Sequence, residues 1–206
     1  MRKPLMLLRP LLGLVASALV FTTAFADTIE EPDTKTAFPR VVSVEVLGQE
    51  RLLEATGVGL REATFLKVNV YAICSYAEAS ATLGDDHARG LINADVAKRL
   101  HMKFVRDVEV KKVTDAFRDG IKKNFKKDEM PFSDDLETFI TYFEEDIVVG
   151  DDMVLTSIPG QGIVVDYKGA TKSLDNPALA KALWTIWFGK KPVSKSMKKG
   201  MLAELK

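Results

Sequence analysis

The sequence predicts an α+β fold, with a largely antiparallel sheet and helices gathered on one of its faces. Three observations support this class. Strand-like segments come in runs and helical segments come in runs, without the regular alternation that builds a parallel sheet. Short turns join the strand-like segments in pairs, as antiparallel hairpins require. A helical segment carries one apolar stripe, which suits a helix that packs one side against a sheet.

The first half of the chain is expected to be mostly strand. Four segments have strand-like patterns: residues 41–46, 52–60, 65–76 and 99–105. The second and third of these form a hairpin across residues 61–64. Gly57 and Gly59 interrupt the second segment, which is typical of a bulge or of a close approach by another backbone. Residues 79–95 are small and polar, and we expect a short helix and loops there.

Two helices are expected next, because apolar residues recur at helical spacing. The stripe of the first helix consists of Val110, Val113, Phe117, Ile121 and Phe125. Ser133 is expected to cap the second helix, with Asp134 and Asp135 in its first turn. The buried side of that helix would be Leu136, Phe139, Ile140 and Phe143.

The last third of the chain should return to strands and end in helix. Residues 153–158 and 163–167 predict a hairpin, with a short strand at 170–174. Asn176 is expected to cap a helix that has Pro177 at its first position and Gly189 just past its end. This helix is apolar nearly all round, so it should be buried. A short helix over residues 194–205 would finish the chain.

The first 26 residues have the layout of a cleavable export signal. Three basic residues precede an apolar run over residues 11–21, and Ala24-Phe25-Ala26 follows. As a helix, 11 residues rise only about 16 Å, roughly half of a bilayer's hydrocarbon core. We therefore expect cleavage after Ala26 and a periplasmic protein without a stable membrane span. Residues 27–40 predict a flexible lead-in and residues 41–206 one domain.

Charge and composition argue against several classes of partner. Removing residues 1–26 takes away three of 29 basic residues and none of 29 acidic ones, so the remaining net charge is 26 − 29 = −3. A nucleic-acid partner is not expected, because it would need a basic surface. His87 and His101 are far apart, and the acidic residues 144–152 lack the spacing of a calcium loop. We expect neither a metal nor an organic cofactor, and we expect Cys74 to be a buried, inert thiol.

Arg61 is the residue that points most clearly to a site. It follows the two glycines at the end of a strand, and the next apolar strand carries Tyr71. An arginine near the buried face of a sheet is costly unless an anion pairs with it. Its partner could be a nearby glutamate (Glu54, Glu62 or Glu78), or a ligand carboxylate or phenolate held by Arg61 and by the Tyr71 hydroxyl.

Several motifs together resemble the chalcone isomerase-like family over residues 41–205. They are the segments 57–61, 65–68 and 70–76, the strand 100–108, Ile158-Pro159-Gly160-Gln161-Gly162, and residues 184–193. The resemblance implies an open-faced β-sandwich, in which a long antiparallel sheet is covered on one face by helices, with a ligand cleft between them. Within the family, the chain is most similar to the exported bacterial branch.

The resemblance also implies positions for the catalytic residues of the plant enzymes. Their arginine matches Arg61, and their hairpin threonine falls at Tyr71, as in the fatty-acid-binding branch. A tyrosine and an asparagine fall near Glu109 and Ala116, and a second threonine falls near Ile186. Four of five catalytic positions therefore differ, and we expect no catalytic residues.

Three functions remain open at this point. The first is a non-catalytic binding protein that holds a small apolar carboxylate, such as a fatty acid, by Arg61 and Tyr71. The second is an isomerase, an intramolecular lyase that acts on a chalcone-like or other enone substrate. The third is an interaction protein whose cleft is vestigial. A cavity lined by Arg61 and Tyr71 would favour the first, and an internal Arg61–glutamate pair without a cavity would favour the third.

Overall fold

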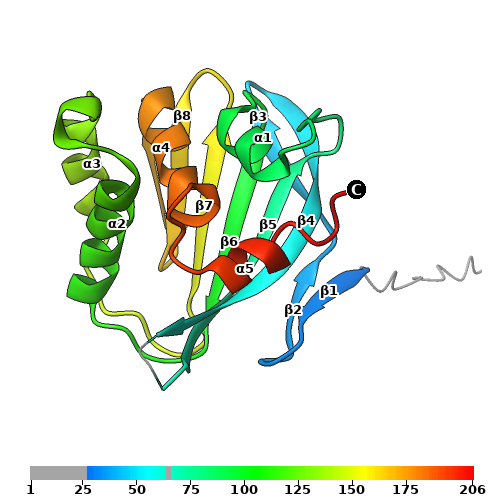
Figure 1. The fold of residues 1–206 in the computed structure, drawn as a ribbon, viewed down its shortest axis with the longest axis horizontal. Coiled ribbons are helices and arrows are strands. Elements are labelled where there is room, and N and C mark those ends of the chain that lie inside the picture. The colour runs from blue at the N-terminus through cyan, green and yellow to red at the C-terminus, as the bar shows by residue number, and fades with distance from the viewer. Residues whose placement is uncertain (1–26, 64–65) are drawn as a thin grey trace, which may run out of the picture.

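The fold is known from a computed structural model, which describes residues 27–63 and 66–206 (Figure 1). The expected export signal, residues 1–26, lies outside the described residues. Within the described part, no helix is both long and apolar enough to cross a bilayer. The predicted α+β class is confirmed.

Seven antiparallel strands form one curled sheet, in which every strand pairs with its neighbours in the sequence. They are β3 (Val41–Val46), β4 (Gln49–Ala63), β5 (Val68–Glu78), β6 (Lys98–Phe104), β7 (Asp152–Ile158), β8 (Gly162–Tyr167) and β9 (Ala170–Leu174). All seven were expected from the sequence. The longest two strands, β4 and β5, pair along most of their length and carry two register shifts, at Ala55/Gly57 and Arg61/Glu62.

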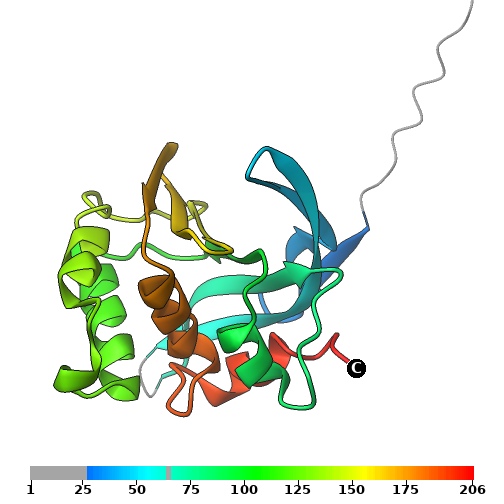
Figure 2. The same ribbon diagram turned by 90° about the horizontal axis from the view of Figure 1, so that it is seen from above.

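The helices gather on one face of this sheet, as predicted (Figures 1 and 2). They are α1 (His87–Asn93), α2 (Val110–Asn124), α3 (Ser133–Ile140), α4 (Pro177–Phe188) and α5 (Lys195–Gly200), with a 3-10 turn at Lys127–Glu129. Helix α4 is central: it packs on β7 and β8 and contacts α1, α2 and α5. Asn176 caps it through a hydrogen bond from the Leu179 amide (2.9 Å). Nine of its residues are buried, because it has neighbours on nearly every side.

The main core fills the space between the sheet and the helices. The apolar helix-facing positions of β6 are Leu100, Met102 and Phe104, and all three are buried. The expected stripe of α2 and the expected buried side of α3 face the same core. There Phe117 stacks on Phe143 at 5.1 Å and meets Phe139 edge-on at 5.0 Å. This core therefore holds α2, α3 and α4 against the sheet.

The opposite face of the sheet is not bare, which corrects the prediction for residues 27–40. Instead of an irregular lead-in, these residues form a hairpin of β1 (Thr28–Glu31) and β2 (Thr36–Pro39). Phe38 is fully buried there and meets the ring of His101 edge-on at 5.4 Å. The Tyr76 hydroxyl donates to the Pro39 carbonyl (2.9 Å). A second, smaller core on this face thus holds the hairpin in place.

Two local predictions also need correction. Ser133 is the first residue of α3 rather than its cap; Phe132 takes the cap position without a side-chain hydrogen bond. Phe132 is buried and meets the ring of Phe125 edge-on at 5.4 Å, so packing holds the residue at this position. Strand β4 runs on to Ala63, so Arg61 lies within the strand and not in the turn after it.

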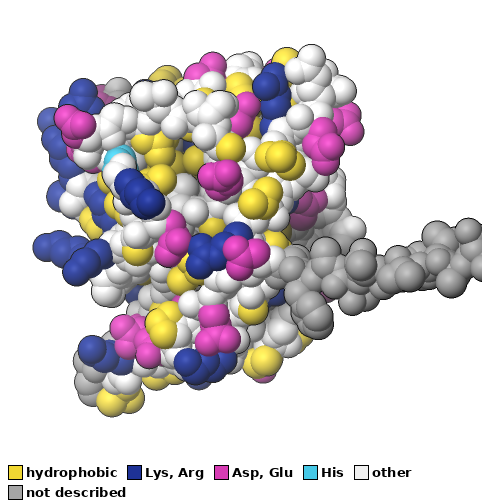
Figure 3. All heavy atoms as spheres, turned by 90° about the vertical axis from the view of Figure 1, so that its right-hand side faces the viewer, with side chains coloured by type: hydrophobic (Ala, Val, Ile, Leu, Met, Phe, Trp, Pro, Cys, Tyr) yellow, Lys and Arg dark blue, Asp and Glu magenta, His cyan; other side chains and the backbone are white. Residues whose placement is uncertain are grey.

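The surface beside β1–β4 carries charges of both signs. Figure 3 shows Lys and Arg side chains interspersed with Asp and Glu side chains on this side of the molecule. Arg40 illustrates the pattern, since it pairs with Asp27 (3.4 Å) and with Glu204 (2.8 Å). Ion pairs of this exposed kind contribute little to stability.

Candidate functional site

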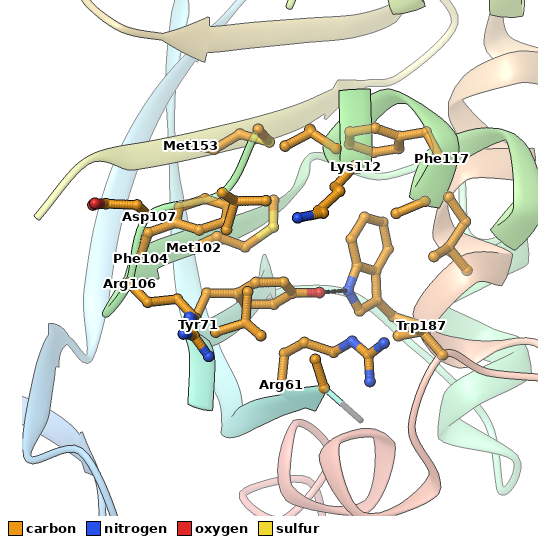
Figure 4. A pocket seen from close by; sticks show the side chains of 17 residues that line it. Arg61, Tyr71, Met102, Phe104, Arg106, Asp107, Lys112, Phe117, Met153 and Trp187 are labelled. Atoms are coloured by element: carbon orange, nitrogen blue, oxygen red, sulfur yellow. Dashed lines mark hydrogen bonds between the residues drawn. The ribbon is translucent and has the colours of Figure 1, made fainter. Parts of the chain in front are cut away.

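A cavity of about 470 Å³ opens between the sheet and helices α2 and α4, near the end of the β4–β5 hairpin (Figure 4). This volume lies within the range of small-molecule sites. Its walls are mainly apolar and include Val70, Met102, Phe104, Phe117, Met153 and Ile186. Strands β4 to β7 supply one side, and α2 and α4 supply the other.

The sheet register brings Arg61 and Tyr71 together on this cavity. The two residues are direct partners across β4 and β5, so their side chains leave the same face of the sheet. Tyr71 is in turn the partner of Phe104 on β6, and the two rings lie 5.3 Å apart. Both predicted site residues therefore line the cavity.

The two glycines before Arg61 explain why a helix can lie beside it. Gly57 and Gly59 share the face of Arg61, and α5 and the segment after it rest directly on them. A Cβ at Gly57 would come within 2.2 Å of the Gly200 carbonyl oxygen, and one at Gly59 would meet Met197 at 2.7 Å. The sequence-based interpretation of a close backbone approach is confirmed. Arg61 is the next side chain on that face.

The Arg61 guanidinium has few partners among the residues that the structure describes. Its Nη1 donates to the backbone carbonyl of Glu62 (2.5 Å). Among the residues that the structure describes, no carboxylate forms an ion pair with it, and Glu54, Glu62 and Glu78 do not. A guanidinium offers five N–H donors, so most of those of Arg61 have no hydrogen-bond partner among the described residues, and the side chain lines the cavity.

Tyr71 is held by a tryptophan from the opposite wall. The Trp187 indole Nε1 donates to the Tyr71 hydroxyl (3.3 Å), across the cavity's inner end (Figure 4). Burial raises the pKa of Tyr71, although the hydrogen bond from Trp187 and the nearby charge of Arg61 oppose this shift. The hydroxyl therefore keeps its proton at neutral pH and can donate it.

Two further cations and one carboxylate line the cavity. Arg106 follows β6, and Lys112 lies in the first turn of α2. Lys112 also pairs with Glu109 (2.8 Å), but both side chains are more than 60% exposed, so the pair is weak and exchangeable. Asp107 accepts a hydrogen bond from the Val149 amide (2.9 Å), and Figure 4 shows its carboxylate directed away from the cavity.

Two of the three other positions carried over from the plant enzymes also line the cavity. They are Ala116 on α2 and Ile186 on α4, neither of which has a hydroxyl or amide side chain. Glu109 is not part of the lining; Lys112, one turn later, is. The resemblance therefore located the walls of the cavity, although the residues on them differ from those of the enzymes.

Sequence reasoning missed Trp187, Arg106 and Lys112 as site residues. Trp187 was expected only to be buried, and it is 3% exposed. Its contact joins residues that are 116 positions apart, so no local pattern could show it. Arg106 and Lys112 flank the start of α2, where lysine is unfavourable for the helix dipole, and that misfit was the available signal.

The remaining candidates lie away from this cavity. Cys74 is fully buried, and burial raises the pKa of its thiol to about 12, which fits the expected inert thiol. His101 is on the opposite face of the sheet, where it contacts Asp152 (3.0 Å). Within residues 27–63 and 66–206, no three metal-ligating side chains gather at one place.

Comparison with known proteins shows the family and the fold. A profile described as chalcone isomerase-like matches residues 35–203. The chain belongs to the chalcone isomerase-like family. Among solved structures, this family member is similar to a fatty-acid binding protein of Arabidopsis thaliana, with a TM-score of 0.68 and 22% identity over 85% of this chain and 96% of the other. A comparison with curated protein sequences gives no match.

Proposed function

We propose that this protein is a periplasmic, non-catalytic binding protein that holds a small apolar carboxylate, such as a fatty acid. One observation carries the proposal. Arg61 and Tyr71 stand side by side on an apolar cavity, and no carboxylate among the described residues pairs with the guanidinium. A cation on the covered face of a sheet that has no carboxylate partner within the protein is stabilised when an anionic ligand binds to it.

The cavity walls support a ligand with an apolar body. The carboxylate would accept hydrogen bonds from Arg61 and from the Tyr71 hydroxyl, while the hydrocarbon part lies along Met102, Phe104 and Met153. The structural neighbour from Arabidopsis thaliana is itself described as a fatty-acid binding protein. That likeness concerns the fold, and the ligand class is carried by the side chains of this chain.

A non-catalytic role is supported by the side chains that replace those of the plant enzymes. Stabilising charge that develops in a transition state needs positioned donors. Ala116 and Ile186 offer none at their places on the cavity wall. If the protein were instead an isomerase, chalcone cyclisation would proceed at rates typical of enzymes, on the order of 1 s⁻¹ or more. We expect no cyclisation above background.

Titration of decanoate into wild type and variants tests the binding site. Arg61→Ala should weaken binding roughly 10- to 150-fold, because a charge-assisted pair contributes about 1.5–3 kcal/mol. Arg61→Lys should recover only part of the affinity, since an ammonium cannot form the bidentate pair. Arg51→Ala is a matched control, because Arg51 lies on the same strand β4 but outside the cavity. Equal affinities for Arg61→Ala and Arg51→Ala would contradict the proposal.

The proposed location can be tested separately. The export layout of residues 1–26 predicts a periplasmic protein that begins at Asp27. N-terminal sequencing of protein from the periplasmic fraction checks this. A chain that begins at Met1, or that stays with the cytoplasmic fraction, would contradict the export part of the proposal and leave the binding part intact.

A further inference from the structure

The polar side chains that face the cavity are all hydrogen-bond donors. Arg61, Arg106 and Lys112 carry only N–H groups. The carboxylate of Asp107 points away and accepts from the Val149 amide. The Tyr71 hydroxyl is the one cavity-facing side-chain group among the described residues that could both donate and accept, so its orientation decides which ligand head groups fit.

Trp187 fixes that orientation. An indole N–H can only donate, so in the Trp187–Tyr71 hydrogen bond the tyrosine oxygen must be the acceptor. A phenol O–H prefers the plane of its ring because the oxygen is conjugated with it. Because the indole N–H is directed at the oxygen, the hydroxyl proton must point away from the indole. No acceptor for this proton is found in the described part of the chain.

The rest of the contact set makes the arrangement rigid. Trp187 is 3% exposed and meets Phe117 edge-on at 6.3 Å, while Tyr71 packs on Phe104. Trp187 is thus enclosed by the core, and the partly buried ring of Tyr71 packs against the same core. Burial also raises the pKa of Tyr71, so the hydroxyl keeps the proton that it offers to the cavity.

We infer that Trp187 is a positioning residue that makes this a donors-only site, selective for ionised acids over alcohols of the same chain length. This inference rests on the proposed function and names the head group that the site accepts. A carboxylate can accept from Arg61 and Tyr71 at once. An alcohol would bring a proton of its own, which would find no acceptor, and an unsatisfied buried donor weakens binding strongly.

Competition binding with decanoate and 1-decanol at pH 8 tests the inference. Wild type, Trp187→Phe, Tyr71→Phe and the double variant would each be titrated against a bound fluorescent fatty acid. Trp187→Phe keeps an aromatic ring and removes the donor, so Tyr71 becomes able to accept from an alcohol. We expect decanoate affinity to fall roughly 3- to 10-fold in Trp187→Phe, the value of one hydrogen bond, while decanol affinity holds or rises.

The double variant separates positioning from structure. If Trp187 acts through the tyrosine hydroxyl, Trp187→Phe should cause no further loss of decanoate affinity once Tyr71 is Phe. Equal weakening of both ligands by Trp187→Phe, or losses that simply add in the double variant, would overturn the inference and leave the proposed function standing. Wild type that binds neither ligand would overturn both. Should Trp187→Phe fail to fold, Tyr71→Phe alone decides, because it must weaken decanoate more than decanol.

Discussion

Trp184 and Trp187 lie one turn apart on α4, and each has a cation from the sheet nearby: Lys98 of β6 beside Trp184, and Arg61 of β4 on the cavity that Trp187 lines. The two cations differ in how many of their hydrogen-bond donors have partners. At the first, Lys98 is 2% exposed, and its ammonium donates to the carbonyls of Leu91 (2.8 Å), Ala94 (2.9 Å) and Ile92 (3.4 Å). The ring of Trp184 lies 5.5 Å from the Lys98 ammonium. At the second, Arg61 donates to one carbonyl and faces a cavity beside Trp187.

The difference separates a structural cation from one that can receive a ligand. Lys98 uses its donors on the carbonyls at the end of α1, so it closes a helix terminus and has no capacity left. Arg61 retains donors that no described residue uses. Burial alone does not mark a binding residue; unused hydrogen-bonding capacity beside an empty space does.

The largest effect should come from the closed region. Trp184→Ala should lower the free energy of unfolding by about 3–5 kcal/mol, because the side chain is fully buried and its removal leaves a large void. Chemical denaturation measures this, and Kd for decanoate should stay unchanged in the folded variant. A loss under about 1 kcal/mol would show that the two regions do not differ in packing as described.

Lys98→Met should cost about 1–3 kcal/mol, since the carbonyls of Leu91 and Ala94 lose their buried donor. The apolar stem is replaced by one of similar length, so the change removes mainly the hydrogen bonds. Lys190→Met is the matched control, because Lys190 is exposed, and it should change stability by less than about 0.5 kcal/mol. Equal changes in the free energy of unfolding for the two substitutions would show that Lys98 has no structural role.

The closed region should also respond to alkaline pH. Burial lowers the pKa of Lys98 to about 8 from 10.5. Between these two pKa values the unfolded chain binds more protons than the folded protein, so the free energy of unfolding rises with pH across this window. This gain is lost as pH falls back through about 8. The stability difference between wild type and Lys98→Met should grow by about 1–2 kcal/mol from pH 7 to pH 9.5. A constant difference would show that Lys98 is not titrating there.

The smallest change in stability should come from the open region. Arg61→Ala should alter the free energy of unfolding by less than about 1 kcal/mol and can raise it, because the substitution removes an unpaired cation from the cavity wall. The thermal shift that decanoate causes in wild type should be lost in this variant. A collapse in melting temperature for Arg61→Ala would assign it to the same structural class as Lys98.

Most elements of the fold were predictable because their patterns are local. Residues close together in the sequence form each of these patterns: the stripe of α2, the cap at Asn176 and the glycines of β4. The β1–β2 hairpin could not be foreseen, because Ile29 and Phe38 are its only buried apolar residues and both depend on contacts with the far face of the sheet. Arg61 and Tyr71 were found from charge and resemblance. The role of Trp187 needed a contact between distant residues.

The length of β4 has a consequence for association between molecules. Its pairing with β3 ends at Glu54, so from Thr56 onward one of its sides has no neighbouring strand in the described sheet. Unpaired strand edges invite pairing with another chain. Here the chain's last turn intervenes: the Glu204 amide donates to the Thr56 carbonyl (3.1 Å), and the Thr56 hydroxyl donates to the Met201 carbonyl (2.8 Å). The C-terminal segment thereby occupies the start of this unpaired edge, where the strand of another molecule would otherwise pair with β4.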